Sequence, residues 1–118
     1  MIVAGALVFG VALTACESPP MRAIRGARHY ATGTRALERS DGTAAIAELE
    51  RAAGLVPHAS EIQNHLGLAY WSDDRAGEAQ VAFQKAIELD CDNDVARANL
   101  ARLIRSGEGE NGVDKNGE

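Results

Sequence analysis

Apolar residues follow the spacing of one α-helical face through two consecutive stretches in the middle of the chain. In the first stretch this face comprises Ile62, Leu66, Ala69 and Tyr70, and in the second it comprises Ala79, Ala82, Phe83, Ala86 and Ile87. Intervals of three and four residues are typical of an amphipathic helix with one buried side. A short polar break at residues 72–74 separates the stretches. The pattern therefore predicts a helical hairpin within residues 60–93.

Polar residues near the start of each predicted helix supply its expected cap. Ser60, followed three residues later by Gln63, predicts a capping box at the first helix. Either aspartate at residues 73–74 is expected to cap the second helix. Gly67 lies inside the first helix, where glycine costs about 1 kcal/mol relative to alanine. We therefore expect Gly67 and Ala79 to lie where the two helices cross, because small residues allow close approach.

The chain repeats itself with a period of 34 residues. Residues 26–59 align without gaps on residues 60–93. The identical pairs are Gly33 with Gly67, Ala45 with Ala79, Ala52 with Ala86, and Leu55 with Leu89, and Leu49 aligns with Phe83. These are the small and apolar positions that a packed pair of helices needs, so the first repeat is expected to form a hairpin like the second.

The period and the residues at these positions resemble the tetratricopeptide repeat. In the second repeat the resemblance rests on Leu66, Gly67, Tyr70, Ala79, Phe83 and Ala86, and in the first on Gly33, Ala45, Leu49, Ala52 and Pro57. The first repeat departs from the family at Thr32 and Ala36, where large residues are usual, and Cys91 replaces the proline that usually closes the second. The resemblance implies an all-α fold, an α-solenoid of two helical hairpins in which these residues pack the repeats.

Residues 94–105 are expected to form a fifth, C-terminal capping helix. Its apolar face comprises Ala96, Leu100, Leu103 and Ile104. Residues 106–118 are rich in glycine and acidic residues and lack such a face, so we expect them to be disordered. The predicted domain thus spans residues 25–105. Its two and a half repeats are fewer than the three usually needed for stability, which leaves self-association or partner binding as ways to complete the fold.

The N-terminal segment, residues 1–15, has the features of a secretory signal. Its apolar run, residues 2–13, is twelve residues long, and a helix needs about 20 residues to cross a bilayer. The sequence LTAC at residues 13–16 resembles the bacterial lipobox, which implies lipidation of Cys16. Residues 16–24 are then expected to form a proline-containing tether. No basic side chain precedes Arg22, unlike a usual signal, and an uncleaved anchor or another processing site remain alternatives.

The residue after Cys16 bears on which membrane would hold the anchor. Glu17 stands where aspartate usually retains lipoproteins at the inner membrane. We therefore expect an outer-membrane lipoprotein of the bacterial cell envelope that faces the periplasm. The corresponding site in an organism with one membrane is the outer face of the plasma membrane.

Charge and motifs narrow the classes of function. The 118-residue chain has a formal net charge of −5, which argues against nucleic acid as a main partner. No glycine-rich phosphate motif occurs, and the three histidines lack the spacing of metal ligands. Residues 90–94 imitate the start of a calcium loop, but Val95 replaces its glycine, so we expect a solvated acidic turn that caps the next helix. No metal, cofactor or enzymatic activity is expected. Cys91 is expected to fill this turn, with pairing to another chain as the alternative.

The tetratricopeptide resemblance also implies a concave groove lined by the first helix of each pair. Carried onto this chain, the groove comprises Tyr30, Thr34, Leu37, Asn64, Leu68, Trp71, Arg102 and Arg105. Aromatic residues beside arginine are typical of interaction hot spots. Trp71 has two interpretations, exposure in the groove or partial burial against a neighbouring helix. The arginines at residues 22, 25 and 28 share one helix face, which either lies on anionic headgroups or is simply solvated.

These observations predict a non-catalytic protein–protein interaction module. We expect a membrane-anchored scaffold of envelope-associated assembly, such as pilus, secretion or envelope synthesis, with a protein or peptide ligand in the groove. The alternatives are a self-associating structural lipoprotein, and hence a homo-oligomer, and an accessory subunit of an envelope enzyme.

Overall fold

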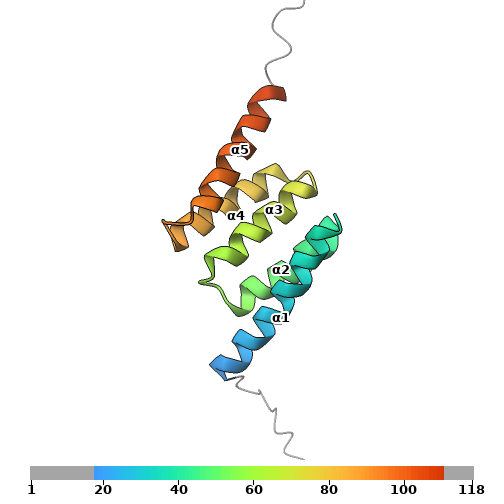
Figure 1. Ribbon diagram of the computed structural model, residues 1–118, viewed down its shortest axis with the longest axis vertical. Helices are drawn as coiled ribbons and strands as arrows, with labels where there is room; N and C mark the ends of the chain where they lie inside the picture. Colours follow the sequence, from blue (N-terminus) through green and yellow to red (C-terminus); the bar gives the residue numbers. More distant parts are fainter. Residues whose placement is uncertain (1–17, 111–118) are drawn as a thin grey trace, which may run out of the picture.

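The computed structural model describes residues 18–110 of the chain, and their side chains as far as Glu108. This part folds into five α-helices, and it contains no strand (Figure 1). The helices are α1 (Pro19–Glu38), α2 (Gly42–Leu55), α3 (Ser60–Ser72), α4 (Ala76–Leu89) and α5 (Asp94–Glu110). The prediction of an all-α fold with five helices is thus confirmed for the described residues.

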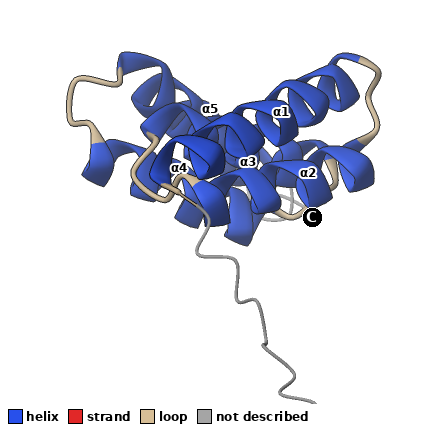
Figure 2. Ribbon diagram, turned by 90° about the horizontal axis from the view of Figure 1, so that it is seen from below, coloured by secondary structure: helices blue, strands red, loops and turns tan. Residues whose placement is uncertain are grey.

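Helix α3 lies at the centre of the arrangement. Consecutive helices pack against each other, and α3 contacts each of the other four. Figure 2 shows α1 and α5 splayed apart on one side of α3, with α2 and α4 on the other side. Helix α3 contacts both α1 and α5, and we call the side of the molecule that these three helices form the α1/α3/α5 face.

The structure repeats with the same period as the sequence. Helices α2 and α4 begin 34 residues apart and end 34 residues apart, and so do the starts of α3 and α5. The turns after α1 and α3 are equivalent, because each contains a residue with a φ of 59° in the left-handed region. The left-handed residue is Ser40 in the first turn and Asp74 in the second. Each turn also has the same backbone hydrogen bond of 2.9 Å, from Asp41 N–H to Ala36 O in the first and from Arg75 N–H to Tyr70 O in the second.

Glycines allow the two hairpins to close tightly. A Cβ atom on Gly33 would lie 2.6 Å from Leu49 Cγ, and one on Gly67 would lie 2.5 Å from Phe83 Cε1. Leu49 and Phe83 are the largest fully buried side chains in the described residues. Each glycine therefore lies against the large side chain of the paired helix, as expected for Gly67 from its position inside a helix.

The small residues predicted to pack the repeats form the core. Those that are buried are Gly33, Ala45, Leu49, Ala52, Leu66, Gly67, Ala79, Phe83 and Ala86. Tyr70 is half-buried, and Pro57 is exposed in the turn between α2 and α3. Pro57 thus shapes a turn, and the prediction that it packs the repeats is wrong.

The helix ends differ from the prediction at both termini of the domain. Helix α1 begins at Pro19, within the segment expected to be a tether. Proline is compatible with the first helical turn because N–H groups there have no partner within the helix. Helix α5 continues to Glu110, so residues 106–110 are helical where disorder was expected. The other predicted segments, residues 1–17 and 111–118, lie outside the described residues.

The predicted caps of α3 and α4 are also wrong. Helix α3 has no side-chain cap, because the Ser60 hydroxyl donates to Ala86 O at 2.7 Å instead. Helix α4 begins after Arg75 without a side-chain cap. The caps that the structure does show are Asp41, which accepts from Ala44 N–H, and Asn93, which accepts from Ala96 N–H.

The inner face of α5 is more polar than predicted. Ala96 and Leu103 are buried as expected, but Ile104 is 45% exposed. Asn99, which the apolar pattern did not include, is only 5% exposed. The reason is a hydrogen bond from Asn99 Nδ2 to Asn64 Oδ1 of α3, at 3.0 Å, which satisfies a buried amide pair.

Candidate functional site

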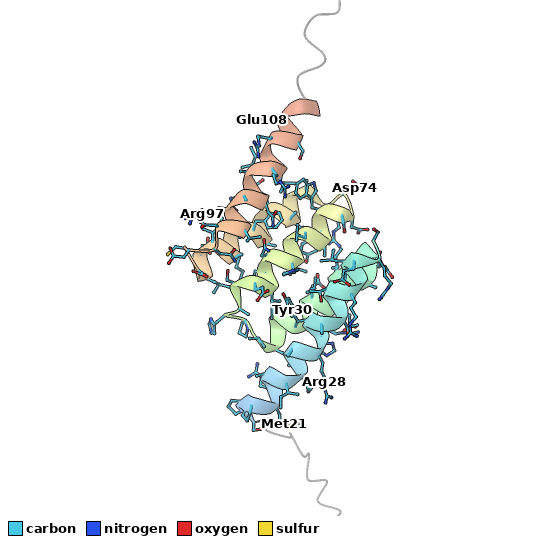
Figure 3. The ribbon with its side chains drawn as sticks, in the orientation of Figure 1. Met21, Arg28, Tyr30, Asp74, Arg97 and Glu108 are labelled. Carbon is cyan, nitrogen blue, oxygen red and sulfur yellow. The ribbon has the colours of Figure 1, made fainter. Side chains whose placement is uncertain are left out.

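The candidate site is the α1/α3/α5 face, which carries the residues of the predicted groove. Tyr30 lies where α1 and α3 meet (Figure 3). Its hydroxyl donates to Glu61 Oε1 at 2.9 Å and lies 3.2 Å from His65 Nδ1, and its ring meets the His65 ring edge-on. Burial, together with the neighbouring Glu61, raises the pKa of Tyr30, so the phenol stays neutral. Tyr30 therefore joins α1 to α3 and uses its hydroxyl within the protein.

The other two predicted α1 residues are partly withdrawn from solvent. The Thr34 hydroxyl donates to Ala31 O of its own helix at 3.1 Å. Leu37 is half-buried against the cluster that contains Leu49 and Leu66. Both side chains are thus used in contacts within the protein, and neither offers a free polar group for a ligand.

Asn64 was predicted to line the groove, and it does line a hollow between α3 and α5, although most of its side chain is buried. It is 4% exposed, and its amide oxygen accepts from Asn99 of α5. Asn64 thus lies at the predicted face, and the structure adds that its amide oxygen links α3 to α5.

Trp71 combines both of its sequence-based interpretations. It is half-buried, with its ring edge-on to Phe83 at a centroid distance of 6.5 Å. With Leu68 and Ser72 it also lines an open hollow of about 270 Å³. On the side toward α5, Trp71 and Leu103 line another hollow of about 410 Å³. The indole is thus held by the core while part of it remains available at the surface.

A larger hollow of about 570 Å³ lies between the first turns of α3 and α5. Its acidic lining residues are Glu61, Asp90, Asp92 and Asp94. Sequence reasoning placed residues 90–94 in a solvated turn and missed that they adjoin the face of α3. The signal was the 34-residue period, which puts the start of α5 in the register of the start of α3.

The arginines predicted at one end of the groove do not line this hollow. Arg102 and Arg105 are exposed on α5, and neither lines the three hollows just described. The carboxylates, and not the arginines, are therefore the charged groups gathered around a concave part of the face.

The opposite side of α3 carries an apolar hollow of about 510 Å³ that the sequence did not reveal. Leu66, Tyr70, Val81 and Ala82 are among its lining residues, and Val81 is 64% exposed. The Tyr70 hydroxyl donates to Glu50 of α2 at 2.6 Å, and burial raises the pKa of Tyr70 to about 12. This hydroxyl is thus a structural donor at the edge of the hollow.

Two findings concern metals and membranes. Within residues 18–108, no group of three His, Cys, Asp or Glu side chains is arranged to hold a metal ion. Among the described helices, none is both long enough and apolar enough to pass through a bilayer. Cys91 is exposed in the turn before α5.

Comparison with known proteins adds no relative to this description. No model of a known protein family matches the chain, and no curated protein matches it. The 34-residue period of helix bounds, turns and buried residues is the main regularity of the described residues.

Proposed function

We propose that the chain is a non-catalytic protein–protein interaction module of the tetratricopeptide-repeat type that binds a peptide segment on its α1/α3/α5 face. The observation that carries the proposal is the pair of equivalent helical hairpins, followed by α5 at the position that the first helix of a third hairpin would occupy. Such stacking places the first helix of each unit on one shared surface, which repeat proteins use for binding.

The side chains on this face define the chemistry of the proposed ligand. Trp71 and Leu68 offer apolar surface held in place by the core. Aromatic residues fixed in this way are typical binding anchors. The carboxylates around the hollow between α3 and α5 attract positive charge. The ligand is thus a segment with an apolar side chain and a nearby lysine or arginine.

The proposal includes attachment of the module to a membrane by a lipid on Cys16, on the periplasmic side of the outer membrane. Support comes from the lipobox-like sequence and from the start of α1 at Pro19, three residues after Cys16. Three residues span about 10 Å at most. The module would then act as a scaffold close to the membrane surface in envelope-associated assembly.

The alternative of a self-associating structural lipoprotein has one observation in its favour. Val95 and Ile104 of the terminal helix are 61% and 45% exposed. Exposed apolar residues on a terminal helix can pack against a second copy. Light scattering over a range of protein concentrations separates the proposals, since the interaction module is expected to stay monomeric without its ligand. An accessory role beside an envelope enzyme predicts co-purification with a catalytic subunit.

A peptide library tests the binding face directly. A chain with Cys16→Ser is used to select from random peptides displayed on phage, and the selected peptides are measured by fluorescence anisotropy. We expect enrichment of an apolar residue about three to five residues from a lysine or arginine, because Leu68 and Trp71 lie about 10 and 15 Å along α3 from Glu61. Asp92→Lys should weaken these peptides about tenfold or more, because a charge in the hollow is reversed.

Glu88→Lys is the matched control for this experiment. Glu88 is exposed on α4, away from the α1/α3/α5 face, and its substitution changes the net charge equally. Equal weakening by both variants, or a library without any basic preference, would contradict the proposed ligand chemistry.

The lipid anchor has a separate test. Expression of the chain in a bacterium that lipidates exported proteins should give incorporation of labelled fatty acid, and Cys16→Ser should abolish it. Cys91→Ser is the control, because Cys91 lies in the turn before α5 and should leave labelling unchanged. Labelling that survives Cys16→Ser would refute the anchor without bearing on the binding face.

A further inference from the structure

The outward side of α1 carries a stripe of exposed apolar and basic residues. We call Met21, Ile24, Arg28 and Arg35 the outer stripe, since their spacing of three, four and seven residues puts them on one side of the helix. The opposite side carries Gly26, Gly33 and Ala36, the buried residues of α1. The outer stripe therefore faces away from the helices that pack on α1.

The first two turns of α1 extend beyond the helix that supports it. Gly26 packs against Leu55 and Val56, at the very end of α2. Residues 19–25 precede that contact, and all of them are exposed. Figures 1 and 3 show this end of α1, with Met21 at its tip, projecting from the rest of the bundle. Met21 and Ile24 are 51% and 49% exposed there, although both are large and apolar.

The charge of α1 is opposite to that of the whole chain. The chain has a net charge of −5, but α1 contains four arginines and no acidic residue before Glu38. Apolar side chains flanked by arginine on one side of a helix are typical of helices that lie at the surface of an anionic bilayer. Packing within the described part of the molecule does not explain the exposed apolar side chains of Met21 and Ile24.

We propose that the outer stripe of α1 is a contact surface for anionic lipid headgroups. Met21 and Ile24 enter the boundary between headgroups and acyl chains, and Arg28 and Arg35 of the outer stripe bind lipid phosphates. Helices α1 and α5 lie at opposite ends of the bundle, so the hollow between α3 and α5 stays accessible (Figure 1). This contact goes beyond the proposed peptide binding, and it requires neither that binding nor the lipid on Cys16.

Vesicle binding tests the contact. The full chain with Cys16→Ser is sedimented with vesicles of phosphatidylcholine alone and with vesicles that also contain phosphatidylglycerol. The apolar N-terminal segment contributes to both, so the readout is the ratio of the two partition coefficients. Each basic residue near an anionic surface strengthens binding about fivefold. The double variant Arg28→Glu with Arg35→Glu should therefore lower the ratio about twentyfold or more.

Three further double variants complete the design. Arg39→Glu with Lys85→Glu makes the same change in net charge at exposed positions outside the outer stripe, and it should leave the ratio within about twofold. Met21→Ser with Ile24→Ser should weaken binding to the anionic vesicles about tenfold. Circular dichroism checks the helical content of each variant, and Arg28→Gln with Arg35→Gln gives a milder change in the same direction if the glutamates disturb α1.

Three outcomes would overturn the proposal. The first is that the chain with an unmodified outer stripe shows no preference for anionic vesicles. The second is that the Arg39 and Lys85 control lowers the ratio of partition coefficients as much as the outer-stripe variant does. The third is an outer-stripe variant that keeps its vesicle ratio but loses self-association in light scattering, which would assign the stripe to a second copy of the chain. Loss of fatty-acid labelling at Cys16 has no influence on any of these results.

Discussion

The absence of one atom, the Cβ of Gly67, allows α3 and α4 to pack closely. The missing Cβ leaves room for the Phe83 ring, which is completely buried. Gly33 has the same relation to Leu49 in the first hairpin. The two large side chains can occupy the centre of each hairpin only because the facing residue has no side chain.

Gly67→Ala tests this relation. The new methyl group would overlap the Phe83 ring, so we expect the free energy of unfolding to fall by about 1–3 kcal/mol in urea denaturation. Gly54→Ala is the control, because a Cβ there meets nothing within 4 Å. That variant should be stabilised by about 0.5–1 kcal/mol through helix propensity. A Gly67→Ala protein as stable as the Gly54→Ala protein would refute the packing argument.

Glu48 makes the stability of the first hairpin depend on pH. His29 Nδ1–H donates to Glu48 Oε2 at 2.7 Å, and Arg51 donates to Oε1 at 2.8 Å. The hydrogen bond from His29 is the largest cause that lowers the pKa of Glu48 below its ordinary value of 4.5. A lowered carboxyl pKa stabilises the fold above that ordinary value, and the stabilisation is lost as the pH falls through the lowered pKa.

We therefore expect Glu48→Gln to destabilise the protein at pH 7 more than at pH 3, as measured by urea unfolding at both values. Protonation of Glu48 at low pH already weakens the same contacts in the unmodified protein. Glu88→Gln, at an exposed position on α4, should show no such difference. A Glu48→Gln effect that is equal at the two pH values would mean that the side chain acts through packing alone.

At the scale of elements, the start of α5 is fastened to the second hairpin by a chain of hydrogen bonds. Asn93 accepts from Ala96 N–H and donates from Nδ2 to Ser60 Oγ at 2.8 Å. Ser60 in turn donates to Ala86 O of α4. One side chain thus caps α5 and links it to α3 and α4, whereas Asp41 only caps α2.

Asn93→Ala is expected to cost more than Asp41→Ala. Loss of a helix cap alone costs about 1 kcal/mol, which is the expected effect at Asp41. At Asn93 the link to Ser60 is lost as well, so the decrease in the free energy of unfolding should be about 2 kcal/mol. Chemical denaturation of the two variants measures the difference. Equal losses would show that the link to Ser60 adds nothing beyond the cap.

At the scale of the whole molecule, stability depends on contacts between helices that are adjacent in the stack. Helix α5 covers α3 and α4 through Ala96, Asn99 and Leu103, all of which are buried. Leu103 packs with Phe83, next to Trp71 and Leu68. A small stack of this kind has few interfaces, so each one is a large fraction of the total.

A chain that ends after Asn93 should lose its cooperative unfolding transition or become oligomeric. It would expose Phe83 and Trp71, and it would leave Asn64 without its partner Asn99. Urea denaturation and light scattering measure both consequences. A chain that ends after Glu108 keeps all of these contacts and is the control. A stable, monomeric chain ending after Asn93 would show that the hairpins suffice without α5.

Much of the fold follows from the sequence, but less of the candidate site does. Apolar spacing and the 34-residue period predicted the helices and the glycine contacts, because both depend on residues close in the chain or on repeated positions. The pattern misplaced the helix ends at Pro19 and Glu110 because helix termini depend on weak local preferences. Tyr30, Leu68 and Trp71 were predicted for the face where they lie, whereas Asn64 was not predicted to be buried.

By itself, then, the sequence determined an all-α chain of two similar hairpins and a fifth helix, since helical periodicity is a local property. The tertiary structure decided which polar groups are used. Hydrogen bonds between helices join Tyr30 to His65, Asn93 to Ser60 and Asn99 to Asn64, and these partners lie 33 to 35 residues apart. Such pairs form only when one repeat stacks on the next, so the buried amides, the acidic hollow and the exposed part of the α1/α3/α5 face are properties of that stacking.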